Sequence, residues 1–216
     1  MDVKVIDMTV LVVYESMFGD AQQIAEAIAA GISESRPVTC LEVGKAPDTV
    51  TPDTTLVVAG SPNHAFGLPR PQSRSDAAER TDEPLVSPGR GLREWLDVVS
   101  AEVPTRAATF DTRMDHPKAL TRMDHAARAS AKRMKKAGFQ IVTDSQHFLV
   151  SDVQGPLLPG ELDRAEGSTT DQREKCRGGD VRGGACGNAG HLPVEIRSDA
   201  RRRLATKVRQ TNVGFP

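Results

Sequence analysis

Residues 8–13 form an unbroken apolar run, MTVLVV, which carries no charge and is rich in β-branched side chains. Such a run is typical of a strand that is buried on both faces of a parallel sheet. After a short polar loop, Ile24, Ile28 and Ile32 recur at the spacing of one helix face. A buried strand followed at once by an amphipathic helix places the chain in the α/β class.

The same alternation of strand and helix continues along the chain. Further strands are predicted at 37–43, 54–60, 106–112 and 139–150, and helices at 92–99 and 118–137. Between them, residues 69–91 are polar and contain four prolines, which predicts a functional loop or a short helix at 75–80. Strands that alternate with helices predict a parallel sheet with helices on both faces.

The composition indicates one folded domain and an unlike tail. The chain has 216 residues, of which 38% are apolar and 26% charged, enough for a globular domain with a sizeable core. Residues 166–216 carry ten Lys/Arg and six Asp/Glu and almost no large apolar side chain, whereas residues 1–165 are acidic. We therefore expect a domain at 1–165 that does not bind nucleic acid by charge alone, and a largely disordered tail at 166–216.

Targeting and metal-binding signals are weak. The N-terminus carries an acid and only a short apolar run, and no run is long enough to cross a bilayer, so we expect a cytoplasmic protein without membrane association. Three cysteines form no recognisable framework: Cys40, Cys176 and Cys186. The last two with His191 would offer three ligands where a closed zinc site needs four, so no metal site is predicted.

The loop after the first strand, YESMFGDAQ (14–22), has the features of an anion-binding turn. Ser16 offers a hydroxyl, Gly19 lets the backbone approach closely, and the helix start supplies free N–H groups. The loop has neither the GxGxxG spacing of a dinucleotide site nor the lysine of a P-loop, which favours a monophosphate. Purely structural turns use the same residue types, so this loop alone leaves both interpretations open. Asp20 is an unexpected charge for an anion site.

Two more loops should meet this one, because ligands of doubly wound sheets lie beyond the carboxyl ends of the strands. The strand at 54–60 ends in GSPNHAFGLPRP, in which His64 and Phe66 are flat groups suited to a planar ring. The strand at 106–112 ends in TFDTRMD, whose polar groups suit the edge of such a ring. Taken singly, Asp111 is more simply a turn residue.

Together these segments resemble a bacterial flavodoxin-like protein. The resemblance spans residues 8–165 and rests on five segments in order: TVLVVYESMFGDAQQIAEAIAAGI, LVVAGSPNHAFGLPRPQSR, GLREWLDVV, ATFDTR and GFQIVTDSQHFLVSDVQGPLLPGEL. It implies a flavodoxin-like doubly wound sandwich with a five-stranded parallel sheet of order 2-1-3-4-5 and a bound FMN.

The resemblance also implies which residues bind FMN. Those that match the phosphate loop are Ser16, Met17, Phe18, Gly19, Asp20 and Ala21. Those that match the loop beside the isoalloxazine are Pro62, Asn63, His64, Ala65, Phe66 and Gly67. Those that match a third loop beside the ring are Phe110, Asp111, Thr112 and Arg113.

The chain departs from the family pattern in three places. The family more often has Asn and Thr where this chain has Asp20 and Ala21, which removes a hydroxyl and adds a carboxylate that would repel a phosphate. A single Trp and a single Tyr leave ring stacking to His64 and Phe66. The resemblance ends at Ala165, where the family's last helix should follow, and its loss would uncover one side of the sheet. The sequence beyond looks like the product of a shifted reading frame.

Three hypotheses for function follow from these residues. The first is an FMN-binding electron carrier between redox partner proteins, a reductase and an acceptor, with no catalytic side chain of its own. The second is an FMN-dependent NAD(P)H:quinone or heme-precursor oxidoreductase, whose second substrate the segment at 69–91 would help to accommodate. The third, motivated by Asp20 and Ala21, is a degenerate fold with weak or no FMN binding.

Overall fold

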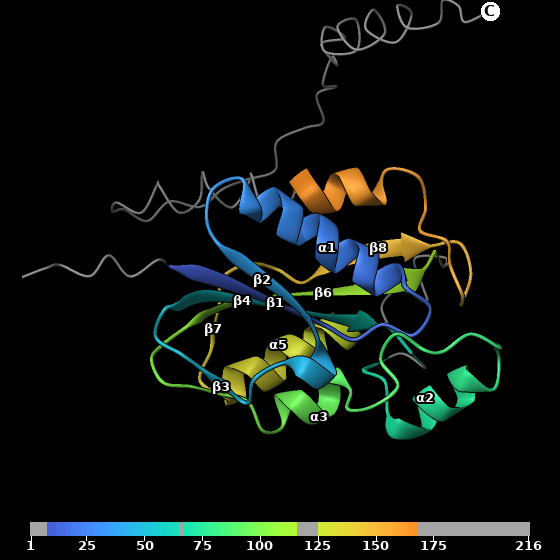
Figure 1. Ribbon diagram of the computed structural model, residues 1–216, viewed down its shortest axis with the longest axis horizontal. Coiled ribbons are helices and arrows are strands. Elements are labelled where there is room, and N and C mark those ends of the chain that lie inside the picture. Colours follow the sequence, from blue (N-terminus) through green and yellow to red (C-terminus); the bar gives the residue numbers. More distant parts are fainter. Residues whose placement is uncertain (1–7, 65–66, 116–124, 168–216) are drawn as a thin grey trace, which may run out of the picture. The chain divides into compact units, whose positions relative to one another are not determined.

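The computed structural model describes residues 8–64, 67–115 and 125–167 (Figure 1). Within them lies a parallel sheet of six strands: β1 Thr9–Tyr14, β2 Val38–Glu42, β4 Thr54–Pro62, β6 Arg106–Met114, β7 Gln140–Ile141 and β8 Gln146–Val150. The strands run in the order β2-β1-β4-β6, and β7 and β8 both pair with β6. The predicted order 2-1-3-4-5 is confirmed.

The fifth predicted strand, at 139–150, is divided in two. The chain leaves the sheet between β7 and β8, where Val142 is exposed and three polar residues follow it. The Ser145 hydroxyl lies 2.9 Å from the Thr109 hydroxyl of β6, so the interruption stays attached to the sheet. Short polar side chains compete with the backbone ladder for hydrogen bonds, which accounts for the break.

Helices cover both faces of the sheet. They are α1 Asp20–Ser33, α2 Pro71–Ala78, α3 Leu92–Leu96 and α5 Ala126–Lys136, with a short 3-10 turn at Val43–Lys45 and helical backbone at 161–167. Figure 1 shows α1 and the 161–167 helix on one face, and α3 and α5 on the other. A two-stranded parallel ribbon, β3 Thr49–Val50 with β5 Ser100–Ala101, completes the described elements.

Each face of the sheet has its own core. On one face, Ile24, Ile28 and Ile32 of α1 pack against the β1 side chains that point to that face, as their spacing predicts. On the other, Trp95 of α3 is fully buried and its indole N–H donates to the Pro47 carbonyl at 2.9 Å. The helix predicted at 92–99 ends earlier, at Leu96, although its side chains and Val99 are buried as expected.

Two other predicted helices begin at different residues from those expected. The short helix expected at 75–80 is α2, which begins with Pro71, a residue whose fixed φ suits the first helical position. The long helix expected at 118–137 is described only from Ala126, because residues 116–124 lie outside the described ranges. At that point the Asp111 carboxylate accepts from the Ala127 N–H at 3.0 Å and stabilises the helix start.

The sequence predicts that the final helix is lost, and this prediction is wrong for the first residues of that helix. Residues 161–167 are helical, and the side chain of Ala165 is completely buried in the core beneath α1. The Arg164 guanidinium lies 4.2 Å from the Phe148 ring centroid of β8, which attaches this helix to the sheet. This part of the sheet is therefore covered. The tail predicted at 166–216 falls almost entirely outside the described residues, so the domain boundary at 165 stays a prediction.

Candidate functional site

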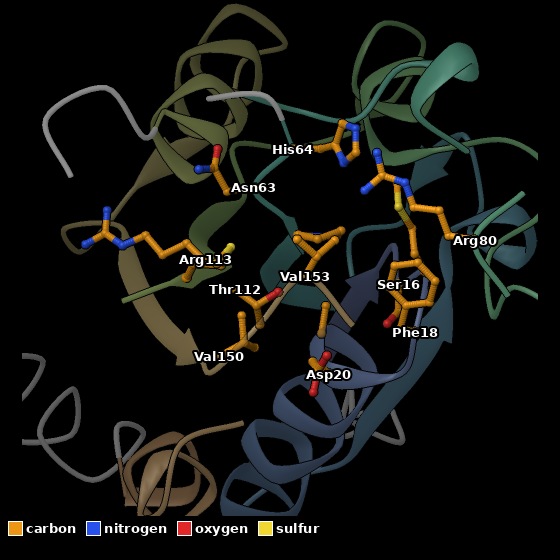
Figure 2. A pocket seen from close by; sticks show the side chains of 14 residues that line it. Ser16, Phe18, Asp20, Asn63, His64, Arg80, Thr112, Arg113, Val150 and Val153 are labelled. Atoms are coloured by element: carbon orange, nitrogen blue, oxygen red, sulfur yellow. The ribbon is translucent and has the colours of Figure 1, made fainter. Parts of the chain in front are cut away.

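A pocket of about 220 Å³ opens at the carboxyl ends of β1, β4, β6 and β8 (Figure 2). It is lined by three predicted loops and by residues beyond them: Ser16, Met17, Phe18, Asp20, Ala21, Pro62, Asn63, His64, Arg80, Thr112, Arg113, Met114, Val150 and Val153. Ten of these are predicted site residues. The parallel sheet therefore brings the three loops together at one edge, as the strand order requires.

The loop before α1 has the backbone geometry of an anion site. Gly19 is the N-cap residue with φ of 105°, in the left-handed region that glycine adopts most readily. Its N–H donates to the Ser16 hydroxyl at 3.1 Å, so the serine holds the turn. Gly19 has no side chain that could cap α1, the Asp20 carboxylate interacts with its own backbone N–H, and the positive end of the helix lies at the pocket.

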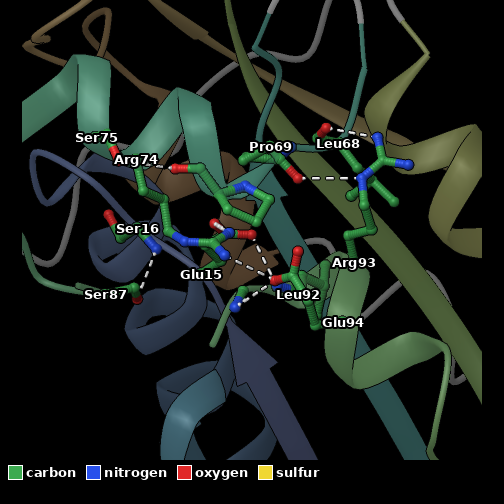
Figure 3. A network of polar contacts seen from close by, with 12 residues as sticks. Glu15, Ser16, Leu68, Pro69, Arg74, Ser75, Ser87, Leu92, Arg93 and Glu94 are labelled. Carbon is green, nitrogen blue, oxygen red and sulfur yellow. Dashed lines mark hydrogen bonds and ion pairs between the residues drawn. The ribbon is translucent and has the colours of Figure 1, made fainter. Parts of the chain in front are cut away.

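Residues 86–87 form hydrogen bonds with this loop. The Ser16 N–H donates to the Ser87 hydroxyl at 3.1 Å, and the Ser87 N–H donates to the Ser16 carbonyl at 2.9 Å (Figure 3). The Val86 N–H donates to the Met17 carbonyl at 3.2 Å. The polar segment at 69–91 is therefore no simple connection between strands, because its end fixes the backbone of the anion loop.

A buried ionic network joins the same segment to the end of β1. Glu15 is completely buried, and its carboxylate accepts from Arg74 of α2 at 3.1 Å and from the Leu92 N–H at 2.8 Å. The second guanidinium arm donates to Glu94 at 2.9 Å, which also accepts from the Gly91 N–H (Figure 3). Burial raises the pKa of Glu15, while the Leu92 N–H and Arg74 oppose that shift. This network was not predicted from the sequence.

Asp20 lines one end of the pocket, but most of its side chain is covered by protein. Its side chain is only 9% exposed, and the loop that follows β8 closes over it. The Leu157 N–H hydrogen-bonds the carboxylate, and a Cβ on Gly155 would lie 2.6 Å from Asp20 Oδ1. Burial is the main cause that raises the pKa of Asp20 above its ordinary value of 3.8. The carboxylate lining this end of the pocket is thus partly shielded by protein.

The loop after β4 forms the opposite end of the pocket. The Asn63 N–H donates to the Thr112 carbonyl at 2.7 Å, which ties this loop to β6. His64 and Gly67 exchange backbone hydrogen bonds of 2.9 and 3.0 Å, so these two residues lie side by side. Burial, followed by the charge of Arg80, lowers the pKa of His64. Ala65 and Phe66, both predicted ring-side residues, lie outside the described ranges.

The third predicted loop reaches the pocket with only half of its residues. Thr112 and Arg113 line it, whereas Phe110 and Asp111 do not. Phe110 is 1% exposed and packs edge-on against Phe148 at 6.0 Å between ring centroids. The Asp111 carboxylate is fully buried, where it caps α5 and lies 2.8 Å from His147 Nδ1. All four residues lie within β6; only its last residues, from Thr112 on, reach the pocket, whereas Phe110 and Asp111 point to the two sides of the sheet.

Four residues that line the pocket were not predicted: Arg80, Met114, Val150 and Val153. Val150 ends β8 and Val153 follows it, so the rule that ligands lie beyond carboxyl ends would have found them. Arg80 follows α2, and nothing in its sequence context shows that this helix reaches the pocket. Gly19 and Gly67, two of the predicted residues, shape the backbone beside the pocket without lining it.

The charged residues of the lining favour an anionic ligand. The lining contains two arginines and a histidine but a single acid, Asp20, whose carboxylate is enclosed by the loop after β8. In Figure 2, His64 and Arg80 lie together at one end and Asp20 at the other. Among the described residues, no three His, Cys, Asp or Glu side chains are grouped so that they could hold a metal ion. No helix in the described part is long and apolar enough to span a membrane.

Solved structures with a similar fold include flavodoxins. An archaeal flavodoxin aligns with 79% of this chain and 99% of its own, at 16% identity and a TM-score of 0.51. Oxidised flavodoxin 2 from Bacillus cereus aligns with 77% of this chain and 99% of its own, at 14% identity and a TM-score of 0.51. No protein-family model and no curated protein sequence matches the chain. At these identities the likeness establishes the flavodoxin-like fold.

Proposed function

We propose that this chain binds FMN in the pocket and carries electrons between redox partner proteins. The observation that supports the proposal most is the convergence of three loops on one pocket with chemically different ends. One end offers Ser16 and the N-terminus of α1, which suit a phosphate. The walls between offer apolar and flat side chains, which suit a planar ring: Met17, Phe18, Pro62, His64 and Val150.

The residues that line the pocket and its edge suit FMN. Ser16, Gly19 and the first-turn backbone would hold the phosphate, while the His64 loop, Thr112 and Val150 would border the isoalloxazine. When bound, FMN supplies reversible one- and two-electron chemistry. The protein's own contribution is to exclude water from the ring, to orient it and to set the local charge. The acidic composition of residues 1–165 would suit docking to basic partners.

The proposal is tested by the visible absorption spectrum of the purified full-length chain and by quenching of FMN fluorescence. We expect flavin bands, and tighter binding of FMN than of riboflavin, which has no phosphate. Ser16→Ala should weaken FMN binding and leave riboflavin binding almost unchanged. A colourless protein that leaves FMN fluorescence unquenched would overturn the proposal.

A second candidate function is that of an FMN-dependent oxidoreductase with its own small-molecule co-substrate, such as NAD(P)H with a quinone. The observation that favours it is the position of Arg80. The segment at 69–91 supplies this arginine, which lies at the pocket end bordered by His64. Steady NADPH oxidation in the presence of a quinone, without an added reductase, would distinguish this enzyme from a carrier.

A third candidate is a degenerate site that holds FMN weakly. The observation behind it is the carboxylate of Asp20 at the end of the pocket where a phosphate would lie. Two unit charges about 4 Å apart repel by ~1 kcal/mol in water and by several-fold more near a protein surface. Asp20→Asn combined with Ala21→Thr should then convert weak FMN binding to tight binding. Tight binding by the unmodified chain would exclude this candidate.

A further inference from the structure

The segment at 69–91 is held in place by contacts at several points. Arg74 of α2 belongs to the buried network with Glu15 and Glu94 and is itself only 7% exposed. Ala77, on the next turn of α2, packs against Met17 and Leu85 in a small apolar cluster. The helix therefore has a defined orientation relative to the anion loop, and the residues that follow its last turn have a defined place too.

Arg80 is one of those residues, and its backbone is tied at both sides. Its N–H donates to the Ala77 carbonyl at 3.1 Å, and its carbonyl accepts from the Gln154 side chain at 2.9 Å. Gln154 belongs to the loop after β8 that also closes over Asp20. Two segments from distant parts of the sequence thus meet beside the pocket and fix the backbone from which the Arg80 side chain extends.

The guanidinium of Arg80 lines the pocket, and the acid that acts on its neighbour His64 is Asp76 of α2, whose charge opposes the lowering of the His64 pKa by burial and which accepts from the Gln72 side chain at 2.7 Å. Among the described residues the Arg80 guanidinium makes no ion pair and no side-chain hydrogen bond. Its titratable neighbour in the lining is His64, a second potential cation, and the one acid in the lining lies at the other end of the pocket. Two partly exposed arginines elsewhere in the described residues do have a carboxylate partner: Arg133 pairs with Asp97 and Arg90 with Asp48. An arginine whose backbone is held beside a histidine is suited to bind an oxyanion from outside.

We propose that Arg80 and His64 form an anion-binding subsite for a second small ligand, one that carries a phosphate or a carboxylate. This subsite is distinct from the start of α1, which would hold the phosphate of FMN. It rests on the proposed function in that the second ligand would lie beside the flavin. An arginine donates two parallel hydrogen bonds to a phosphate or carboxylate, and the imidazole of His64 adds one more donor. The ligand would be an anionic electron donor or acceptor.

The test uses the full-length chain saturated with FMN and titrated calorimetrically with inorganic pyrophosphate and, separately, with succinate. The variants are Arg80→Gln and, as a matched control, Arg36→Gln, an exposed arginine beyond the other end of α1. We expect Arg80→Gln to weaken binding of the better anion about tenfold, because charge-assisted hydrogen bonds are lost, and Arg36→Gln to leave it unchanged. A preference for pyrophosphate would identify a phosphate ligand, and a preference for succinate a carboxylate.

Three results would overturn the inference. The first is binding of neither anion, and the second is equal binding by both variants. The third is loss of affinity for FMN but not for riboflavin in Arg80→Gln, which would assign this arginine to the phosphate of FMN. The urea midpoint of Arg80→Gln must match that of the unmodified chain. If no flavin binds at all, the proposed function fails, and the same titrations on the flavin-free chain still decide whether Arg80 binds anions.

Discussion

Gly155 lies directly against the carboxylate of Asp20, so closely that a Cβ would come within 2.6 Å of Oδ1. The contact joins two loops that are far apart in the sequence, and it explains how an acid is accommodated at the start of α1. The loop after β8 can approach because glycine has no side chain and because its φ is 87°. The same contact keeps water away from the carboxylate, which accounts for the raised pKa of Asp20.

Gly155→Ala should destabilise the domain more than Gly160→Ala does. Both glycines have φ of 87°, so alanine costs about 1 kcal/mol of backbone strain at either position. Only at 155 would the new Cβ also overlap a carboxylate, since nothing lies within 4 Å at 160. We expect an additional loss of about 1 kcal/mol in the free energy of unfolding, measured by urea denaturation. Equal losses would show that the loop moves away without cost.

Asp20→Asn should stabilise the domain at neutral pH and gain little in acid. Burial raises the pKa of Asp20 in the folded state, so the folded protein disfavours the ionised form relative to the unfolded chain. This penalty is absent below the ordinary value of 3.8 and develops as pH rises through the folded pKa. The difference between the variant and the unmodified chain should therefore grow from pH 4 to pH 7 in urea midpoints. The exposed Asp163→Asn is the control; a parallel trend there would contradict the assignment.

Arg74→Met should cost far more stability than Arg133→Met. Loss of Arg74 leaves Glu15 fully buried without its cation, and breaking such a pair costs about 3–5 kcal/mol. Arg133 pairs with Asp97 at the surface, where about 0–1 kcal/mol is expected. The cost of Arg74→Met should shrink at acid pH, because a protonated Glu15 needs no cation. Similar costs for the two variants, by urea denaturation at pH 7, would show that the buried network does not stabilise the fold.

Gly60→Ala should be among the most disruptive single-methyl additions in the chain. A Cβ on this residue of β4 would lie 2.0 Å from the ring of Phe110 on the neighbouring strand. The ring is enclosed in the core and has no room to withdraw, so we expect a loss of at least about 2 kcal/mol. Gly89→Ala, with nothing within 4 Å, is the matched control and should be nearly neutral. A thermal melt that ranks the two variants alike would contradict the packing described.

Much of the fold was predictable from hydrophobic pattern. The apolar run at 8–13 and the spacing of Ile24, Ile28 and Ile32 identify β1 and α1, because both elements bury their side chains in the cores of the sheet. The break between β7 and β8 was not recognised, since the apolar residues on both sides of it read as one strand. Side-chain pattern reports burial well and backbone hydrogen bonding poorly.

The site was predictable as far as it depends on strand ends. Ser16, His64 and Thr112 meet because parallel strands end at one edge, a property of topology. Arg80 depends instead on how α2 packs, and that is determined by the pair of Arg74 with the buried Glu15. A glutamate next to a polar loop reads as exposed in a sequence, so its burial and everything it positions could not be inferred.

The loop after β8, which encloses Asp20, also determines at what point of protein synthesis the pocket can form. The loops after β1, β4 and β6 leave the ribosome early, yet Leu157 and Gln154, which contact Asp20 and Arg80, come from the last part of the described domain. Until those residues have been made, the carboxylate at the start of α1 faces solvent and the segment carrying Arg80 lacks its second attachment. A nascent chain would therefore complete its pocket only with the loop after the final strand, and binding of a ligand there would follow translation of the domain rather than accompany it.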